Sequence, residues 1–212
     1  MSKSLYSLML PDEVVSAVDR LALKSGMNRS QLVARILAEH LSLLTPERRI
    51  EQILQQVDRF FAEEAEMVSQ LMPHQPSMQI KTALSYRYRP TIRYDLRLYR
   101  EPEDGAVGEL SMTLRTQAED LLTLMEAFFA SWIPLEQAVL KGRGAPRCRL
   151  QPGRFIRSIA LPAEETDAGR FSEAITNYVQ LLDTSFKDYI GGRLDESDLA
   201  YRLQEYAKGE TV

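Results

Sequence analysis

The sequence of 212 residues contains one cysteine and two histidines, His40 and His74, and this scarcity excludes several classes of protein. One cysteine cannot form an intramolecular disulfide, so a secreted fold held together by disulfides is excluded. One cysteine and two separated histidines do not supply the spaced ligands of a zinc or nickel site, so we expect no metal and no other cofactor. Neither histidine has a recognisable catalytic partner, so we expect no enzymatic activity and name no catalytic residue.

Long apolar runs are also missing from the sequence. None approaches the 18 residues that a transmembrane helix needs. The first residues contain only a short apolar stretch that is soon followed by acidic residues, which is a poor match to a signal peptide. We therefore expect a cytoplasmic protein that has no membrane partner.

An overall excess of positive charge is missing as well. The 26 basic and 30 acidic side chains give a net charge of -4, unlike a typical nucleic-acid-binding protein. The charge is uneven, however, because residues 137–163 hold six basic and no acidic side chains, whereas residues 164–212 are strongly acidic. The basic segment either binds an anion, or is solvated, or docks on the acidic segment. Its candidate secondary anion-binding residues are Lys141, Arg143, Arg147 and Arg149.

The first 44 residues have the pattern of one strand and two helices. Alternating apolar residues predict a short strand over residues 4–10. Pro11 ends this strand and suits the first turn of a helix that extends to about Lys24. Gly26 ends that helix, and Asn28 caps a second helix with an apolar face. One strand and two helices cannot bury a core alone, whereas a symmetric dimer would supply a partner strand and a second set of helices.

This order of features resembles the ribbon-helix-helix family of bacterial DNA-binding proteins. The match covers about a fifth of the chain. It implies a homodimer in which two strands pair antiparallel and lie in the major groove of double-stranded DNA. The residues that carry the resemblance are Leu10-Pro11, Asp12-Glu13, the apolar face of Val14, Val18, Leu21 and Ala22, and Gly26-Met27-Asn28-Arg29-Ser30.

The resemblance also implies which residues contact DNA. The base-facing positions are Leu5, Ser7 and Met9, with Lys3 further out, and the phosphate-clamp positions are Asn28, Arg29 and Ser30 at the start of the second helix. Base-facing residues of the family usually donate hydrogen bonds, whereas Leu5 and Met9 can only touch a thymine methyl group or exclude water. Two interpretations therefore remain open: a ribbon that binds DNA with modest direct readout, or a ribbon that only dimerises the chain.

The remaining sequence predicts a long helix and an α+β region. Apolar residues at helical spacing predict a straight amphipathic helix over residues 46–72. Alternating residues beyond it predict an antiparallel sheet with one buried face. Further predicted elements are helices over 117–140, with a break or kink at Pro134, over 166–190 and over 195–207, and a strand over 154–161. We thus expect a ribbon-helix-helix domain over 1–45, a connecting helix over 46–72 and an α+β domain over 73–212.

The polar face of the predicted sheet is rich in arginine. It is either a basic platform for nucleic acid or another anion, on which Tyr99 stacks a base, or the solvated face of a half-exposed sheet, balanced by the nearby acids Asp95, Glu101 and Glu103. The basic residues of this face are Lys81, Arg87, Arg89, Arg93 and Arg97. Cys148 also lies among arginines, which would lower the pKa of an exposed thiol, although an ordinary unreactive cysteine is the simpler interpretation.

Two hypotheses of different classes follow. The first is a dimeric, sequence-specific transcriptional regulator of bacterial type, acting as a repressor, with double-stranded DNA and a second copy as its partners. Its 73–212 region would bind a small molecule or a protein, or would promote a higher oligomer. The second is an interaction or scaffold protein, of the plasmid-maintenance or toxin-neutralising kind, that uses the ribbon only to dimerise.

Overall fold

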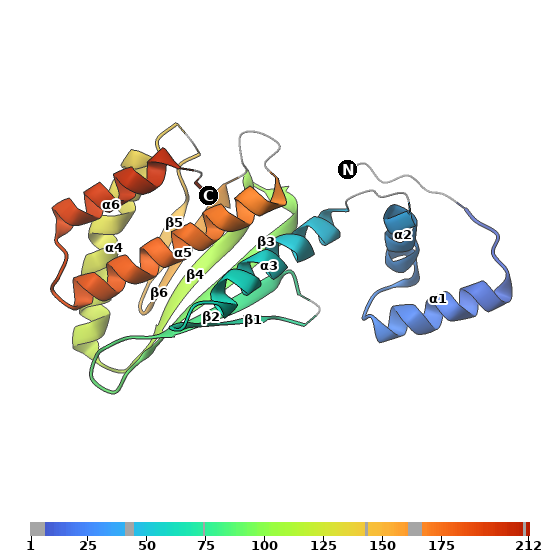
Figure 1. Ribbon diagram of the computed structural model, residues 1–212, viewed down its shortest axis with the longest axis horizontal. Helices are drawn as coiled ribbons and strands as arrows, with labels where there is room; N and C mark the ends of the chain where they lie inside the picture. Colours follow the sequence, from blue (N-terminus) through green and yellow to red (C-terminus); the bar gives the residue numbers. More distant parts are fainter. Residues whose placement is uncertain (1–6, 41–44, 74, 143, 161–166, 210) are drawn as a thin grey trace. The chain divides into compact units, whose positions relative to one another are not determined.

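In the computed structural model, residues 7–40, 45–73, 75–142, 144–160, 167–209 and 211–212 are described. They belong to two compact units, Met1–Thr45 and Pro46–Val212, which are treated separately below. The fold is α+β, as the sequence predicts. The elements in chain order are α1 (Asp12–Lys24), α2 (Arg29–His40), α3 (Pro46–Ala62), β1 (Met67–Leu71), β2 (Ser77–Ala83), β3 (Thr91–Glu103), β4 (Ala106–Arg115), α4 (Glu119–Val139), β5 (Cys148–Gln151), β6 (Arg154–Ala160), α5 (Ala168–Ile190) and α6 (Glu196–Lys208), as Figure 1 shows.

The first unit contains two helices whose ends follow the sequence signals. Gly26 follows α1 with a φ of 64°, the left-handed conformation that glycine adopts without strain. Asn28 precedes α2, and its side-chain oxygen accepts a hydrogen bond of 2.9 Å from the backbone N–H of Gln31. The Gln31 side chain accepts in return from the backbone N–H of Asn28. This reciprocal pair satisfies two donors at the start of α2.

The predicted N-terminal strand is not found in the described residues. Residues 1–6 lie outside them, residues 7–11 form no strand, and the first regular element is α1. A strand is held by hydrogen bonds to a neighbouring strand, and a single copy of this unit offers none. Residues 41–44, predicted to complete the second helix, also lie outside the described residues.

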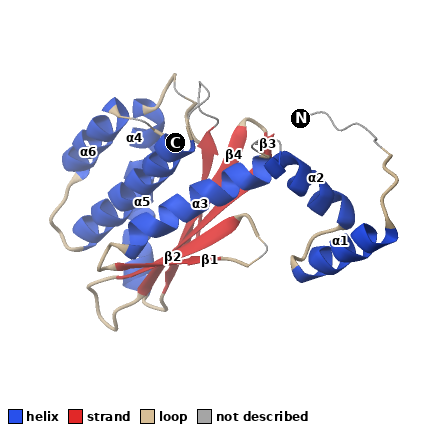
Figure 2. Cartoon of the chain, turned by 45° about the vertical axis from the view of Figure 1, so that its right-hand side comes forward, coloured by secondary structure: helices blue, strands red, loops and turns tan. Residues whose placement is uncertain are grey.

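The second unit is built on one antiparallel sheet of six strands in the order β1-β2-β3-β4-β6-β5. Alternate residues of the central strands are buried, and Ile80, Tyr94, Met112 and Phe155 are fully inaccessible. Helices α3, α4, α5 and α6 contribute to the same core and gather on this face of the sheet (Figure 2). The predicted one-sided sheet is therefore confirmed, and its opposite face is left open.

The core is rich in aromatic side chains from α4 and α5. Phe129 of α4 stacks on Phe155 of β6 with ring centroids 4.1 Å apart, and Phe128 meets Phe186 of α5 edge to face. Of the predicted break or kink at Pro134, the break is wrong, because α4 runs through this residue. Burial of the helix on both sides of Pro134 offsets the one backbone hydrogen bond that proline removes.

The predicted helix over 46–72 is also wrong beyond Ala62. Residues 67–71 instead form β1, in which Met67 lies opposite Thr82 and Leu71 opposite Met78. Glu63 and Glu64 would place negative charge at the negative end of a longer helix, which favours ending it before them. No helix in the described parts of the chain is long and apolar enough to cross a membrane.

Candidate functional site

The phosphate-clamp positions lie together at the start of α2. The Asn28 side chain caps the helix, and Arg29 and Ser30 follow it with exposed side chains. Arg29 forms a bidentate ion pair with Asp19 of α1, with Nε–Oδ1 and Nη2–Oδ2 distances of 2.6 and 2.5 Å. The hydrogen bond from Arg29 lowers the pKa of Asp19. Because both side chains are about half exposed, this pair contributes little to stability and can exchange for a phosphate contact.

The base-facing positions are only partly described. Lys3 and Leu5 lie outside the described residues, and Ser7 and Met9 are exposed in a segment without secondary structure. The structure thus brings the clamp residues together but does not assemble a surface from the ribbon residues.

The apolar face of the first unit is largely exposed. Among its described residues, the buried apolar side chains are Ala22, Leu32 and Ala38. Leu21 and Ile36 stay 46% and 41% exposed, although each lies on the face that should form the core. Leu8, Leu10, Val14, Leu23 and Leu37 are exposed as well. A single copy of the unit therefore buries only part of its apolar face.

On the open face of the sheet, one row of side chains crosses four strands. Lys81 of β2 lies opposite Arg93 of β3, which lies opposite Thr113 of β4, which lies opposite Arg154 of β6. Neighbouring strands are about 4.8 Å apart, so the row extends about 14 Å. Lys81 and Arg93 are like charges placed directly opposite each other, an arrangement that destabilises a sheet.

The open face as a whole is strongly basic. Arg93 pairs with Asp95 at 2.9 Å, and Arg149 pairs with Glu109 at 3.3 Å. Six cations lie on this face, Lys81, Arg93, Arg97, Arg115, Arg149 and Arg154, together with two carboxylates, Asp95 and Glu109. Within the described residues, Lys81, Arg97 and Arg115 form no ion pair. The predicted face of Lys81, Arg93 and Arg97 is thus confirmed.

Two arginines expected on this face lie elsewhere. Arg87 and Arg89 belong to the loop between β2 and β3, because β2 ends at Ala83. Tyr88 and Arg89 in this loop have φ angles of 62° and 43°. The loop is tied to the start of α4 by a hydrogen bond of 2.5 Å from the Tyr86 hydroxyl to Asp120.

The basic segment 137–163 does not form one surface. Lys141 is exposed in a loop, and Arg143 lies outside the described residues. Arg147 pairs with Asp104 at 3.4 Å, while Arg149 lies on the open face. The carboxylates that the segment contacts in the described residues come from positions 104, 109 and 136, so ion pairing with the acidic segment 164–212, one of the three alternatives, is not found there. Arg157 instead contacts that segment through the backbone oxygen of Val212 and the ring of Tyr178.

Cys148 is not an activated thiol. It lies beside the carboxylate of Glu136 with an Sγ–Oε2 distance of 3.9 Å. Burial, together with this negative charge, raises the pKa of the Cys148 thiol to about 12. The charge of Arg157 lowers this pKa, but burial and Glu136 outweigh it, and Arg147 and Arg149 point to other carboxylates.

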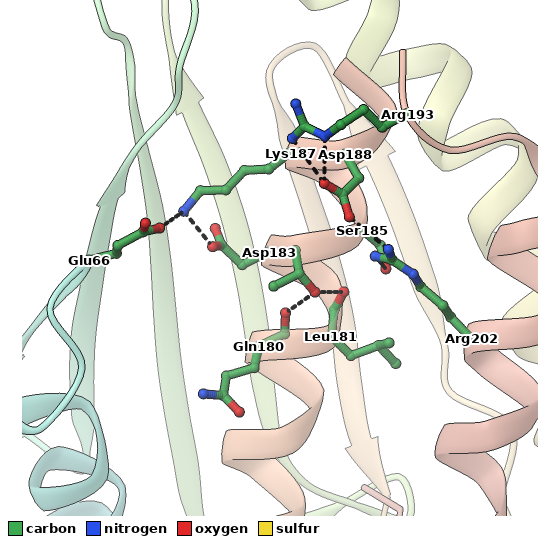
Figure 3. A network of polar contacts seen from close by, with 10 residues as sticks. Glu66, Gln180, Leu181, Asp183, Ser185, Lys187, Asp188, Arg193 and Arg202 are labelled. Carbon is green, nitrogen blue, oxygen red and sulfur yellow. Dashed lines mark hydrogen bonds and ion pairs between the residues drawn. The ribbon is translucent and has the colours of Figure 1, made fainter. Parts of the chain in front are cut away.

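A groove with a volume of about 790 Å³ is lined by α5, α6 and the start of β1. Beside it lies a polar network that the sequence did not predict. Lys187 extends from α5 to Asp183 at 2.8 Å and to Glu66 at 3.3 Å (Figure 3). Asp183 also accepts a hydrogen bond from the Tyr94 hydroxyl. Only the i,i+4 spacing of Asp183 and Lys187 could have been noticed, because Glu66 is distant in the sequence.

Most charges beside the groove are mutually neutralised. Asp188 accepts hydrogen bonds from both Arg193 and Arg202, and Lys187 lies between two carboxylates (Figure 3). Burial raises the pKa of Asp183, although the hydrogen bond from Lys187 acts in the opposite direction. Glu64 also lines the groove and accepts a hydrogen bond from the Gln180 amide without an ion pair in the described residues, so the groove offers aromatic surface and one carboxylate that lacks a cation partner. Within the described residues, no group of three or more His, Cys, Asp or Glu side chains could hold a metal ion.

Comparisons of the chain with protein-family models, with curated proteins and with solved structures find no match. The ribbon-helix-helix resemblance therefore stays a prediction, and function is argued from the two surfaces described above.

Proposed function

We propose that the protein is a homodimeric DNA-binding regulator of transcription, in which the N-terminal unit pairs with a second copy. The observation that supports this proposal best is the exposed apolar face of α1 and α2. Burying one Leu or Ile side chain is worth about 1.5–3 kcal/mol, so exposed residues such as Leu21 and Ile36 favour association strongly. A second copy offers the same apolar face and a matching strand for residues 4–10, because a two-fold axis places identical surfaces against each other. A different protein would not offer this match.

The start of α2 supports the DNA-binding part of the proposal. Backbone N–H groups in the first turn of a helix attract anions, and Arg29 adds a guanidinium that suits phosphate. In the free protein Asp19 occupies this guanidinium through two hydrogen bonds, and the exposed pair can exchange for a phosphate. In a dimer the two clamps lie on either side of the paired strands, where they would bind the backbones that flank one groove. Where the bound site overlaps a promoter, a protein bound in this way blocks RNA polymerase, which is why we propose a repressor.

The test is fluorescence anisotropy with a labelled duplex from the protein's own promoter region, at several salt concentrations. We expect binding that weakens steeply with salt, because phosphate contacts release counterions. Arg29→Ala should weaken binding, whereas Arg20→Ala, the same charge change at an exposed position of α1, should not. Undetectable binding at low salt, or equal binding by Arg29→Ala, would overturn the proposal.

A scaffold that uses the first unit only to dimerise is the second candidate. It is favoured by the apolar Met9 at a base-facing position and by the occupation of Arg29 by Asp19. In that case sedimentation would show a dimer that binds no duplex, and a protein encoded by a neighbouring gene would co-purify with it.

A further inference from the structure

The open face of the sheet carries an excess of positive charge that does not stabilise the fold. The chain as a whole is acidic, with a net charge of -4, yet the regularly paired part of this face presents six cations against two carboxylates, with Glu103 as a further carboxylate near Tyr99 at its margin. A face that is only solvated usually intersperses both signs, since isolated like charges gain nothing from the sheet. Lys81 lies directly opposite Arg93, which costs stability. A pattern that costs stability points to a ligand of opposite charge.

We propose that the open face of the β2-β3-β4-β6 sheet binds the phosphate backbone of duplex DNA. The inference rests on the proposed function and adds a second DNA-contacting surface, in the 46–212 unit, to the clamp of the first unit. Successive charges of one DNA strand rise by about 3.4 Å, so the row of about 14 Å from Lys81 to Arg154 covers several phosphates. Lys81, Arg97 and Arg115 are available for this contact because no described carboxylate pairs with them.

The centre of the row is occupied by a threonine between two arginines. Thr113 lies between Arg93 and Arg154, and its hydroxyl is covered by neighbouring atoms and has no hydrogen-bond partner in the described part of the chain. Because this hydroxyl is inaccessible, a phosphate above the row would contact the flanking arginines and not Thr113.

The composition of the face favours a duplex over a single strand. Proteins that hold single strands stack the bases on aromatic side chains. Tyr99 is the one aromatic residue among the open-face positions of β2, β3, β4 and β6 between Gln79 and Ser158. It follows the last regular pair of β3 with β4 and therefore lies at the margin of the face. Positive charge without a stacking platform suits a backbone whose bases are already paired. A single strand that bound as tightly as the duplex would contradict the inference.

The first experiment compares two doubly substituted full-length proteins on the labelled promoter duplex. Lys81→Gln/Arg115→Gln removes two unpaired cations from the open face, whereas Arg59→Gln/Lys208→Gln removes two exposed cations from α3 and α6. All four side chains are exposed, so we expect every variant to fold. Each lost phosphate contact lowers the slope of log K against log salt by about 0.9. We expect a slope smaller by about 1–2 for the first variant and an unchanged slope for the second.

The second experiment locates the contact directly. The full-length protein is acetylated with and without the duplex, and modification of each lysine is measured by mass spectrometry. We expect the duplex to shield Lys81 and to leave Lys208 of α6 reactive, both being exposed in the free protein. Shielding of Lys141 alone would instead assign the contact to the loop of segment 137–163 and overturn the inference.

The two proposals fail in different ways. If Arg29→Ala weakens binding while Lys81 stays reactive and the open-face variant binds normally, the regulator proposal stands and the second surface is wrong. If Arg29→Ala has no effect while the open-face variant binds less, the open face is supported and the clamp is wrong. If the wild-type protein binds no duplex at low salt, both are wrong.

Discussion

Arg157 of β6 and Glu136 of α4 form an ion pair in which both side chains are completely buried, with an Nε–Oε1 distance of 2.7 Å. Arg157 also donates to the backbone oxygen of Val212 and lies over the ring of Tyr178, 4.0 Å from its centroid. A buried charge is tolerated only where its partners replace water. This pair therefore connects α4, α5 and the end of the described chain to the sheet at one point.

We expect the loss of one partner of this pair to be far worse than the loss of both. Glu136→Gln leaves the buried guanidinium of Arg157 without a counter-charge, which should cost about 3–5 kcal/mol in the free energy of unfolding. Glu136→Leu combined with Arg157→Met removes both charges and should cost less than either single change. Urea denaturation followed by circular dichroism measures the differences. A double variant less stable than both single variants would contradict this account.

A second prediction concerns the pH dependence of stability. Burial raises the pKa of Asp183, whose carboxylate faces Lys187 and Tyr94, with Glu66 nearby. An acid with a raised folded-state pKa contributes stability that is complete below its unfolded pKa, about 3.9, and is lost as the pH rises through the folded value. Asp183→Asn cannot gain this proton. Relative to that variant, the wild-type protein should become more stable as the pH falls from about 7 to about 4.

The measurement is urea denaturation of both proteins at several pH values in this range, with the difference in the free energy of unfolding plotted against pH. Asp195→Asn is a suitable control because that carboxyl is exposed and its pKa is lowered by its hydrogen bonds with Ser197 and with the backbone N–H of Asp198. A difference between wild type and Asp183→Asn that stays constant with pH would refute the assignment.

The local signals in the sequence predicted much of the fold. Alternation around Ile92 and Tyr94 placed the buried face of the sheet correctly, and Gly26 and Asn28 marked the boundary of two helices. The errors arose where distant contacts decide the structure. Residues 67–71 keep helical spacing in the sequence but gain more from pairing with β2. The segment 148–151 has too few residues to show a period, yet it pairs with β6 as β5.

For the candidate sites too, local sequence patterns predicted what distant contacts do not decide. The alternation of residues along the strands was enough to assign Lys81, Arg93 and Arg97 to one face. The pairing of β4 with β6 is needed to show that Arg154 lies in the same row. The charge run 137–163 was misleading because strand alternation sends its members to opposite faces. Arg149 points to the open face, whereas Arg157 points into the core. The network around Lys187 needs a contact with Glu66 that no sequence pattern contains.

A third prediction tests the ion pair that holds the clamp residue. Asp19→Asn removes the negative charge that competes with phosphate for Arg29. We expect the variant to bind the promoter duplex more tightly than the wild type, because Arg29 no longer has to give up its ion pair with Asp19 to bind a phosphate. Its stability should be nearly unchanged, since the pair is exposed. Glu13→Gln, the same charge change on an exposed side chain of α1, is the control, and equal gains in both variants would assign the effect to net charge rather than to Arg29.

The last prediction concerns the loop between β2 and β3. Tyr88 has a φ of 62° and a fully exposed side chain, so it is strained without any packing in return. The left-handed conformation costs a residue with a Cβ about 1–2 kcal/mol. Glycine avoids this cost, but it loses more conformational entropy on folding, which offsets part of the gain. Tyr88→Gly should therefore raise the free energy of unfolding by about 0.5–1 kcal/mol.

Tyr88→Ala is the control for this loop, because alanine removes the ring and keeps the Cβ that causes the strain. We expect its stability to equal that of the wild type in the same urea titration. Equal gains in the glycine and alanine variants would mean that the exposed ring, and not the backbone, destabilises the loop. Retention of such strain next to Arg87 and Arg89 is typical of loops that serve a contact, because selection for stability alone would favour glycine at this position.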